Sequence, residues 1–115
     1  MRKKIVAGNW KMNTTVPEGV ALAKEVVGEA ASLSSEVKLI VGTPFTHLAS
    51  VADVLAGSQG ALSAQNCADE AKGAYTGEVS AKMLASLPVE YVILGHSERR
   101  EMFNETDETV NKKLK

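Results

Sequence analysis

The sequence has 115 residues and a formal net charge of -1, with 13 Lys and Arg against 14 Asp and Glu. This balance offers no basic surface that would capture nucleic acid or an acidic membrane by electrostatic attraction. Hydrophobic residues make up 44% and charged residues 23%, which is typical of a globular domain and excludes disorder by composition. The length predicts one compact domain.

Cysteine content and the first residues both favour a cytoplasmic location. Cys67 is the single cysteine, so no intrachain disulfide can form and a reducing compartment fits best. The basic residues 2–4 are followed by only a short apolar stretch before Gly8, too short for an export signal. No apolar run approaches the roughly 20 residues of a membrane-spanning helix. We therefore expect a soluble cytoplasmic protein without a membrane partner.

Short apolar runs alternate with segments of helical periodicity along the chain. The runs predict strands at residues 4–11, which open as a buried strand, and at residues 37–42, 61–65 and 91–94. Pro17 fits a first helical turn, Gly57 a position just after a helix end, and Thr106 an N-cap. The expected apolar helix faces are, in chain order, Val20, Ala23, Val27, Ala30; Leu48, Val51, Ala52, Leu55; Val79, Met83, Leu84, Leu87; Val110, Leu114.

Four strand–helix units in succession imply parallel strands joined by right-handed crossovers. Such strands form either an open sheet or part of a (β/α)8 barrel. The first strand runs into Gly8-Asn-Trp-Lys11, which lacks the glycine-rich turn of doubly wound nucleotide-binding sheets, so the barrel is favoured. A complete barrel takes roughly 250 residues, so the chain is interpreted as part of one.

Polar residues stand where the expected strands end, which is where parallel α/β folds gather functional groups. Asn9 and Lys11 follow the first strand, Gln65 and Asn66 the third, and His96 the fourth. A lysine and a histidine at one rim suit a substrate that carries negative charge and exchanges a proton. We expect Asn9, Lys11 and His96 to end neighbouring strands and to converge on one anionic ligand.

The remaining titratable residues allow further expectations. Glu98 either pairs with Lys11 across the rim or belongs to a solvated charge cluster. His96 precedes a short helical turn, and a helix N-terminus beneath the imidazole disfavours the cation, which predicts a neutral donor. His47 is expected to be an ordinary surface residue, and Cys67 a small buried or semi-buried side chain. Two distant histidines and one cysteine form no ligand set, so no metal is expected.

Four segments resemble signatures of the triosephosphate isomerase family, in that family's order and at its spacing. The resemblance extends over essentially residues 4–115. It implies an α/β fold, a partial TIM barrel, in which residues 1–115 are the N-terminal half from the first strand into the helix after the fourth. The four segments are Ala7-Gly-Asn-Trp-Lys-Met-Asn13, Ala64-Gln-Asn66, Gly73-Ala-Tyr-Thr-Gly-Glu-Val-Ser80 and Leu94-Gly-His-Ser-Glu-Arg-Arg100.

The resemblance also implies a reaction, the interconversion of dihydroxyacetone phosphate and glyceraldehyde 3-phosphate in glycolysis and gluconeogenesis, without a cofactor. Asn9 and Lys11 would contact the phosphorylated triose, and Lys11 would also take part in catalysis by holding the phosphate and the carbonyl-side oxygens electrostatically. His96 would be the neutral electrophile that hydrogen-bonds the enediolate and moves protons between its oxygens. Glu98 would support Lys11.

A homodimer is implied as well. Thr76, with Tyr75 and Glu78, lies on the long third loop, which in this family reaches into the neighbouring subunit. There it would brace Asn9 and Lys11 of the second copy.

Part of the family's active site is missing from the sequence. The family's base is a glutamate in a Tyr-Glu-Pro-Val-Trp-Ala-Ile-Gly-Thr-Gly segment, which this sequence does not contain. The lid and the glycine-rich phosphate loops are missing too. Glu98 and Glu105 match supporting and structural positions, so neither replaces the base. Three hypotheses stay open: an isomerase part that works with a complementing C-terminal half, a non-catalytic half-barrel scaffold or folding fragment that self-associates, and a stand-alone phosphate-binding module.

Overall fold

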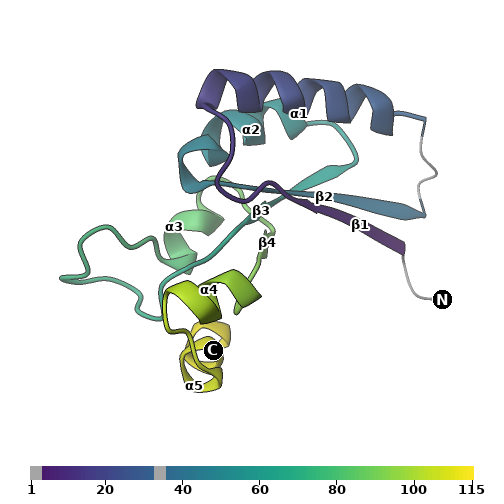
Figure 1. The fold of residues 1–115 in the computed structure, drawn as a ribbon. Helices are drawn as coiled ribbons and strands as arrows, with labels where there is room; N and C mark the ends of the chain where they lie inside the picture. The colour runs from purple at the N-terminus through teal and green to yellow at the C-terminus, as the bar shows by residue number, and fades with distance from the viewer. Residues whose placement is uncertain (1–3, 33–35) are drawn as a thin grey trace.

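The computed structural model describes residues 4–32 and 36–115, which contain one parallel sheet with the strand order β1-β2-β3-β4. The register sets Ala7 opposite Ile40 and Val41 opposite Leu62. The sheet curls as half of a (β/α)8 barrel does (Figure 1), so the predicted fold class is confirmed. The strands are β1 (Lys4–Asn9), β2 (Val37–Thr43), β3 (Gly60–Ala64) and β4 (Tyr91–Val92).

Helices fill the connections between the strands and follow the last one. The first two long helices pack together over one face of the sheet, whereas the last two follow the end of β4 (Figure 1). No helix in the part of the chain that the structure describes is both long and apolar enough to cross a membrane. The helices are α1 (Val16–Ala30), the 3-10 helix η1 (Phe45–His47), α2 (Leu48–Leu55), α3 (Ala81–Ala85), α4 (Ser97–Met102) and α5 (Asp107–Leu114).

Local sequence signals explain where the helices begin and end. The Glu18 carboxylate accepts hydrogen bonds from the Thr15 backbone N–H at 2.9 Å and from the Thr15 hydroxyl at 2.8 Å, which caps α1 and lowers the pKa of Glu18. Gly57 follows α2 with a φ of +78°, a left-handed conformation that glycine adopts freely. The Thr106 hydroxyl accepts a hydrogen bond from the Thr109 N–H at 3.2 Å, so Thr106 is the N-cap of α5, as predicted.

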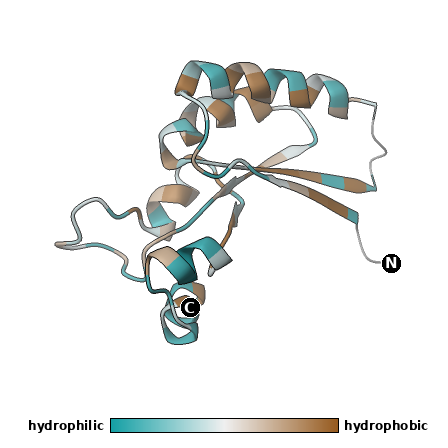
Figure 2. Cartoon of the chain, in the orientation of Figure 1, coloured by the Kyte–Doolittle hydropathy of each residue, from teal (hydrophilic) through white to brown (hydrophobic). Residues whose placement is uncertain are grey.

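The main hydrophobic core lies between the helices and the sheet. Leu48 and Val51 of α2, Leu62 of β3 and Leu84 of α3 belong to one buried cluster, and burial of each such side chain contributes about 1.5–3 kcal/mol. Cys67 is buried in the same cluster, as predicted, and this burial raises the pKa of its thiol. Figure 2 shows hydrophobic segments on the helices and strands that enclose this core.

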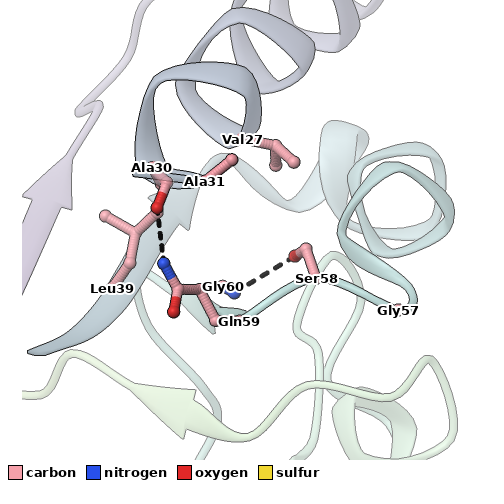
Figure 3. Close-up of a pocket in the computed structure, with 8 residues that line it drawn as sticks. All are labelled: Val27, Ala30, Ala31, Leu39, Gly57, Ser58, Gln59 and Gly60. Carbon is pink, nitrogen blue, oxygen red and sulfur yellow. Dashed lines mark hydrogen bonds between the residues drawn. The ribbon is translucent and has the colours of Figure 1, made fainter. Parts of the chain in front are cut away.

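A cavity of about 390 Å³ lies at the amino end of β3, beside the C-terminal ends of α1 and α2. The Gln59 amide donates a hydrogen bond to the carbonyl oxygen of Ala30, the last residue of α1 (Figure 3). The Ser58 hydroxyl accepts a hydrogen bond from the Gly60 N–H at 3.1 Å. These bonds satisfy a carbonyl that the end of α1 leaves free and fix the start of β3.

The first strand is exposed, and the expectation that it is buried is wrong. Ile5 is 58% and Val6 55% exposed, because β1 is an edge strand paired with β2 and the described residues do not cover it. The fourth strand is shorter than the predicted residues 91–94. The regular strand ends at Val92, although the next N–H, that of Ile93, still donates to the Ala64 carbonyl oxygen at 2.9 Å.

His47 is buried, with 2% of its surface exposed, so the expectation of a surface position is also wrong. Its ring lies beside the loop between β1 and α1, where the hydroxyls of Thr14 and Thr46 satisfy both ring nitrogens. Met83 and Leu114 were expected on apolar helix faces that pack inward, and this expectation is wrong as well. Both are exposed, because the short helices α3 and α5 have sides that no other described residue covers.

Candidate active site

A pocket of about 490 Å³ opens at the carboxyl end of the sheet, between the loop that follows β1 and the segment that enters α4. Asn9, Lys11, His96 and Glu98 all line it. β1 and β4 are the two edge strands, so the expectation that these residues end neighbouring strands is wrong. The curl of the sheet brings them to one pocket instead. The other lining residues are Met12, Asn13, Gln65, Arg99, Met102 and Phe103.

The loop after β1 holds Lys11 in a left-handed backbone conformation, with φ at +58°. Such a conformation costs a residue with a side chain about 1–2 kcal/mol and persists where neighbouring contacts hold it. Asn9 supplies one of these contacts, because its Oδ1 accepts a hydrogen bond from the Lys11 N–H at 3.0 Å. The end of β1 therefore sets the direction in which Lys11 leaves the strand.

Gln65 is a site residue whose role the sequence did not reveal. Its Nε2 lies 3.0 Å from the Lys11 carbonyl oxygen, 3.1 Å from the Gly42 carbonyl oxygen and 3.2 Å from Asn9 Oδ1. A single amide group at the end of β3 thus contacts acceptors that come from β1, β2 and the loop after β1. The position of Gln65 at a strand end was the signal available in the sequence.

Lys11 and Glu98 form an ion pair across the pocket, with 2.7 Å between Nζ and Oε1. The structure therefore favours pairing over a solvated cluster for Glu98. The hydrogen bond from Lys11 is the main cause that lowers the pKa of Glu98, and the charge of Lys11 adds to it. Both side chains are partly exposed, so the pair contributes little to overall stability. Its effect is to direct the ammonium group into the pocket.

His96 is the N-cap of α4, and its ring accepts a hydrogen bond from that helix. Nδ1 lies 3.1 Å from the backbone nitrogen of Glu98, whose N–H it accepts. A nitrogen that accepts a hydrogen bond carries no proton, so in the neutral ring the proton is on Nε2. His96 therefore offers one N–H donor to the pocket that it lines.

Glu105 has a structural environment, as expected, and does not line the pocket. Its Oε2 accepts hydrogen bonds from Arg99 Nε at 2.7 Å and from Lys113 Nζ at 2.5 Å, while Lys113 also donates to Asn66 Oδ1 at 2.8 Å. Burial opposes ionisation of Glu105, but the hydrogen bonds from Lys113 and Arg99 outweigh it and lower the pKa. The Glu105 carboxylate thus links α4 to α5 through Arg99 and Lys113, and Lys113 in turn contacts Asn66, which follows β3.

The loop of residues 65–80 extends away from the sheet (Figure 1). Tyr75, Thr76 and Glu78 are exposed on it, and a hydrogen bond of 2.8 Å from the Ala68 N–H to the Val79 carbonyl oxygen closes its base. None of the three exposed residues lines the pocket. Their assignment to a dimer interface stays a prediction.

Comparison with known proteins decides the family. Residues 4–115 match the family model described as triosephosphate isomerase. The chain belongs to the triosephosphate isomerase family. It is 54% identical to a triosephosphate isomerase of Bacteroides fragilis and 53% identical to one of Phocaeicola vulgatus, in both cases over 115 residues. A triosephosphate isomerase of Alkaliphilus oremlandii is 55% identical over the same length.

The matches cover 100% of this chain and 46% of each of these three relatives. The chain therefore spans about half the length of the triosephosphate isomerases it resembles. The pocket with Asn9, Lys11 and His96 lies within the matched part.

Proposed function

We propose that this chain provides the charge-stabilising and proton-moving part of a triosephosphate isomerase active site. The convergence of Asn9, Lys11 and His96 on one pocket, with the Lys11 ammonium held by Glu98, is the observation that carries the proposal. The substrate is a phosphorylated triose, and the reaction belongs to glycolysis and gluconeogenesis. A cytoplasmic location is part of the proposal and rests on the single free cysteine, Cys67.

The chemistry follows from what these groups can do. Removing a proton from the carbon next to a carbonyl places negative charge on the oxygen. The Lys11 ammonium and the Nε2–H of His96 are cationic and neutral donors that stabilise such an oxyanion from fixed positions. Because His96 holds a single ring proton, it can give that proton to one substrate oxygen and receive one from the other.

The base that removes the carbon-bound proton must come from another segment. The sequence contains no Tyr-Glu-Pro-Val-Trp-Ala-Ile-Gly-Thr-Gly segment. Glu98 is occupied by Lys11, and Glu105 by Arg99 and Lys113. We therefore propose that this chain catalyses isomerisation together with a C-terminal half and has little activity without one.

A complementation experiment tests this proposal. The chain is mixed with a second chain that carries the remaining, C-terminal part of the Bacteroides fragilis relative, and the interconversion of the two triose phosphates is measured. Turnover is expected from the mixture and not from either piece. His96→Gln in this chain should abolish the gain, whereas Lys24→Gln, at an exposed position of α1, should not. A mixture no more active than its two parts would contradict the proposal.

The homodimer belongs to the same proposal. Tyr75, Thr76 and Glu78 are exposed on a loop that projects from the sheet, which suits contact with a second copy. Replacing Thr76 with Arg in the complemented protein should weaken its dimer in sedimentation experiments, because a charged side chain would have to be buried in the contact.

The exposed edge strand supports a second candidate, a non-catalytic half-barrel scaffold or folding fragment that self-associates. Ile5 and Val6 of β1 are more than half exposed, and an uncovered strand edge with apolar side chains favours association. Sedimentation of the chain alone tests this candidate. A mass well above 12.2 kDa is expected, and a clean monomer would eliminate it.

A further inference from the structure

His47 lies outside the pocket, yet it packs against the loop that carries Lys11. Its Nε2 is 2.9 Å from Thr14 Oγ1, and its Nδ1 is 2.8 Å from Thr46 Oγ1. The Trp10 ring meets the imidazole edge to face, with 6.5 Å between ring centroids. Trp10, directly before Lys11, and Thr14, three positions after it, thus both contact one buried ring.

The hydrogen bonds of Thr14 determine which nitrogen of His47 carries the proton. The Thr14 hydroxyl donates its hydrogen to the Asn13 carbonyl oxygen at 2.5 Å. It therefore accepts the hydrogen bond from His47 and Nε2 is the protonated nitrogen, while Nδ1 accepts from the Thr46 hydroxyl. A neutral His47 satisfies both contacts and donates a hydrogen bond to the loop through Thr14.

Thr14 occupies a conformation that needs such a contact. Its φ is +71°, which is rare for a β-branched residue, and Lys11 is left-handed as well. The segment of residues 11–14 is therefore strained at both ends and keeps its shape through neighbouring contacts. Asn9 and Gln65 hold the Lys11 end, and His47 holds the Thr14 end.

The ring itself cannot easily move. A Cβ atom added to Gly19 of α1 would lie 2.4 Å from His47 Cδ2, so the helix approaches the ring as closely as a glycine allows. α1 on one side and Trp10 on another leave the imidazole little room to move. A fixed ring is what an anchor for a strained segment requires.

We propose that His47 is a positioning residue that, through Thr14, holds residues 11–14 in the conformation presenting the Lys11 ammonium to Glu98 and the pocket. Without this anchor the segment relaxes toward unstrained conformations, and the contact between Lys11 and Glu98 loosens. The inference rests on the proposed function for the role it gives Lys11, but the contact it concerns can be measured in this chain without any assay of isomerisation.

Four substitutions distinguish the hydrogen bond between His47 Nε2 and Thr14 from the one between Nδ1 and Thr46. His47→Gln places an amide nitrogen near the position of Nε2 and can keep the bond to Thr14, whereas His47→Asn can replace Nδ1 alone. Thr14→Val removes the accepting hydroxyl and keeps the β-branched shape. Thr46→Val removes the other hydroxyl and is the matched control.

The readouts are the pKa of Glu98 by NMR titration and the hydrogen-exchange rate of the Lys11 amide. His47→Asn and Thr14→Val are expected to raise the pKa of Glu98 toward its ordinary value. They should also speed exchange at Lys11 by about fivefold, the size of one lost hydrogen bond. His47→Gln and Thr46→Val should leave both readouts close to those of the parent chain.

Unchanged readouts in folded His47→Asn and Thr14→Val would overturn the proposal. If His47→Asn fails to fold, Thr14→Val decides alone, because Thr14 is an exposed residue and Val keeps its β-branched shape. Equal effects of Thr46→Val and Thr14→Val would also overturn it, since the hydrogen bond to Thr14 would then have no particular role in holding the segment. Failure of the complementation assay would contradict the proposed function and leave this result intact.

Discussion

The side-chain amide of Gln65 donates to the backbone carbonyl oxygen of Lys11 at 3.0 Å, across 54 positions of sequence. The same nitrogen lies 3.1 Å from the carbonyl oxygen of Gly42 at the end of β2. One side chain therefore couples the loop that carries Lys11 to the two central strands. These contacts join segments that meet at the rim of the pocket.

Replacing Gln65 with Leu should loosen the rim. The Lys11 carbonyl oxygen loses its partner, whereas the Gly42 carbonyl oxygen keeps the Trp10 N–H at 2.9 Å. The loss is expected to lower the free energy of unfolding by about 1–3 kcal/mol in urea titrations and to raise the pKa of Glu98. Gln59→Leu is the matched control, because Gln59 caps α1 at the other end of the sheet. A Glu98 pKa that moves equally in both variants would contradict this view of Gln65.

The ion pair between Lys11 and Glu98 predicts a pH dependence of stability. The pKa of folded Glu98 lies below its ordinary value of 4.5, so the pair stabilises the fold above that value. The contribution is lost as the pH falls through the lowered folded pKa. Lys11→Met should return the pKa toward 4.5 in an NMR titration and remove that acid-induced loss, whereas Lys72→Met should do neither.

Glu105 should be far more important for folding than its neighbours on the surface. Glu105→Gln removes the charge that pairs with Lys113 and Arg99, and Lys113 is almost fully buried. Breaking a buried pair by removing one partner costs about 3–5 kcal/mol, which urea unfolding would measure. The exposed Glu101 of α4 provides the control, and equal stability of Glu105→Gln and Glu101→Gln would refute the expectation.

Two glycines of α1 should respond to alanine in opposite directions. A Cβ at position 19 meets the His47 ring at 2.4 Å, whereas nothing lies within 4 Å of one at position 28. Gly19→Ala is expected to destabilise the fold by about 1–3 kcal/mol. Gly28→Ala should stabilise it by up to about 1 kcal/mol, because alanine is the better helix former. Thermal melts of both variants check the pair, and a stabilised Gly19→Ala would show that the ring moves aside.

Local sequence signals predicted the elements well, and contacts between distant segments account for the errors. Gly57 and Thr106 marked helix boundaries correctly, because caps depend on a few adjacent residues. His47 was misplaced because one of the hydroxyls that make its burial favourable, that of Thr14, is 33 positions away. The exposure of β1 depends on which strands lie beside it, and an apolar run carries no such information.

The residues of the pocket were predictable from the sequence only in part. Strand ends of parallel sheets lie at one edge, so Asn9, Lys11 and His96 could be grouped from the sequence alone. The bridging role of Gln65 could not, because it needs the coordinates of three segments at once.

The contact between Trp10 and His47 gives the chain a built-in optical probe. Trp10 is the only tryptophan of the sequence, it immediately precedes Lys11, and its ring meets that of His47 at 6.5 Å. Trp10 also packs against the hydrophobic core, so its fluorescence reports on the segment next to the pocket and on the core beside that segment. Rearrangement of that segment can be followed in real time without a label, while circular dichroism records the helices separately.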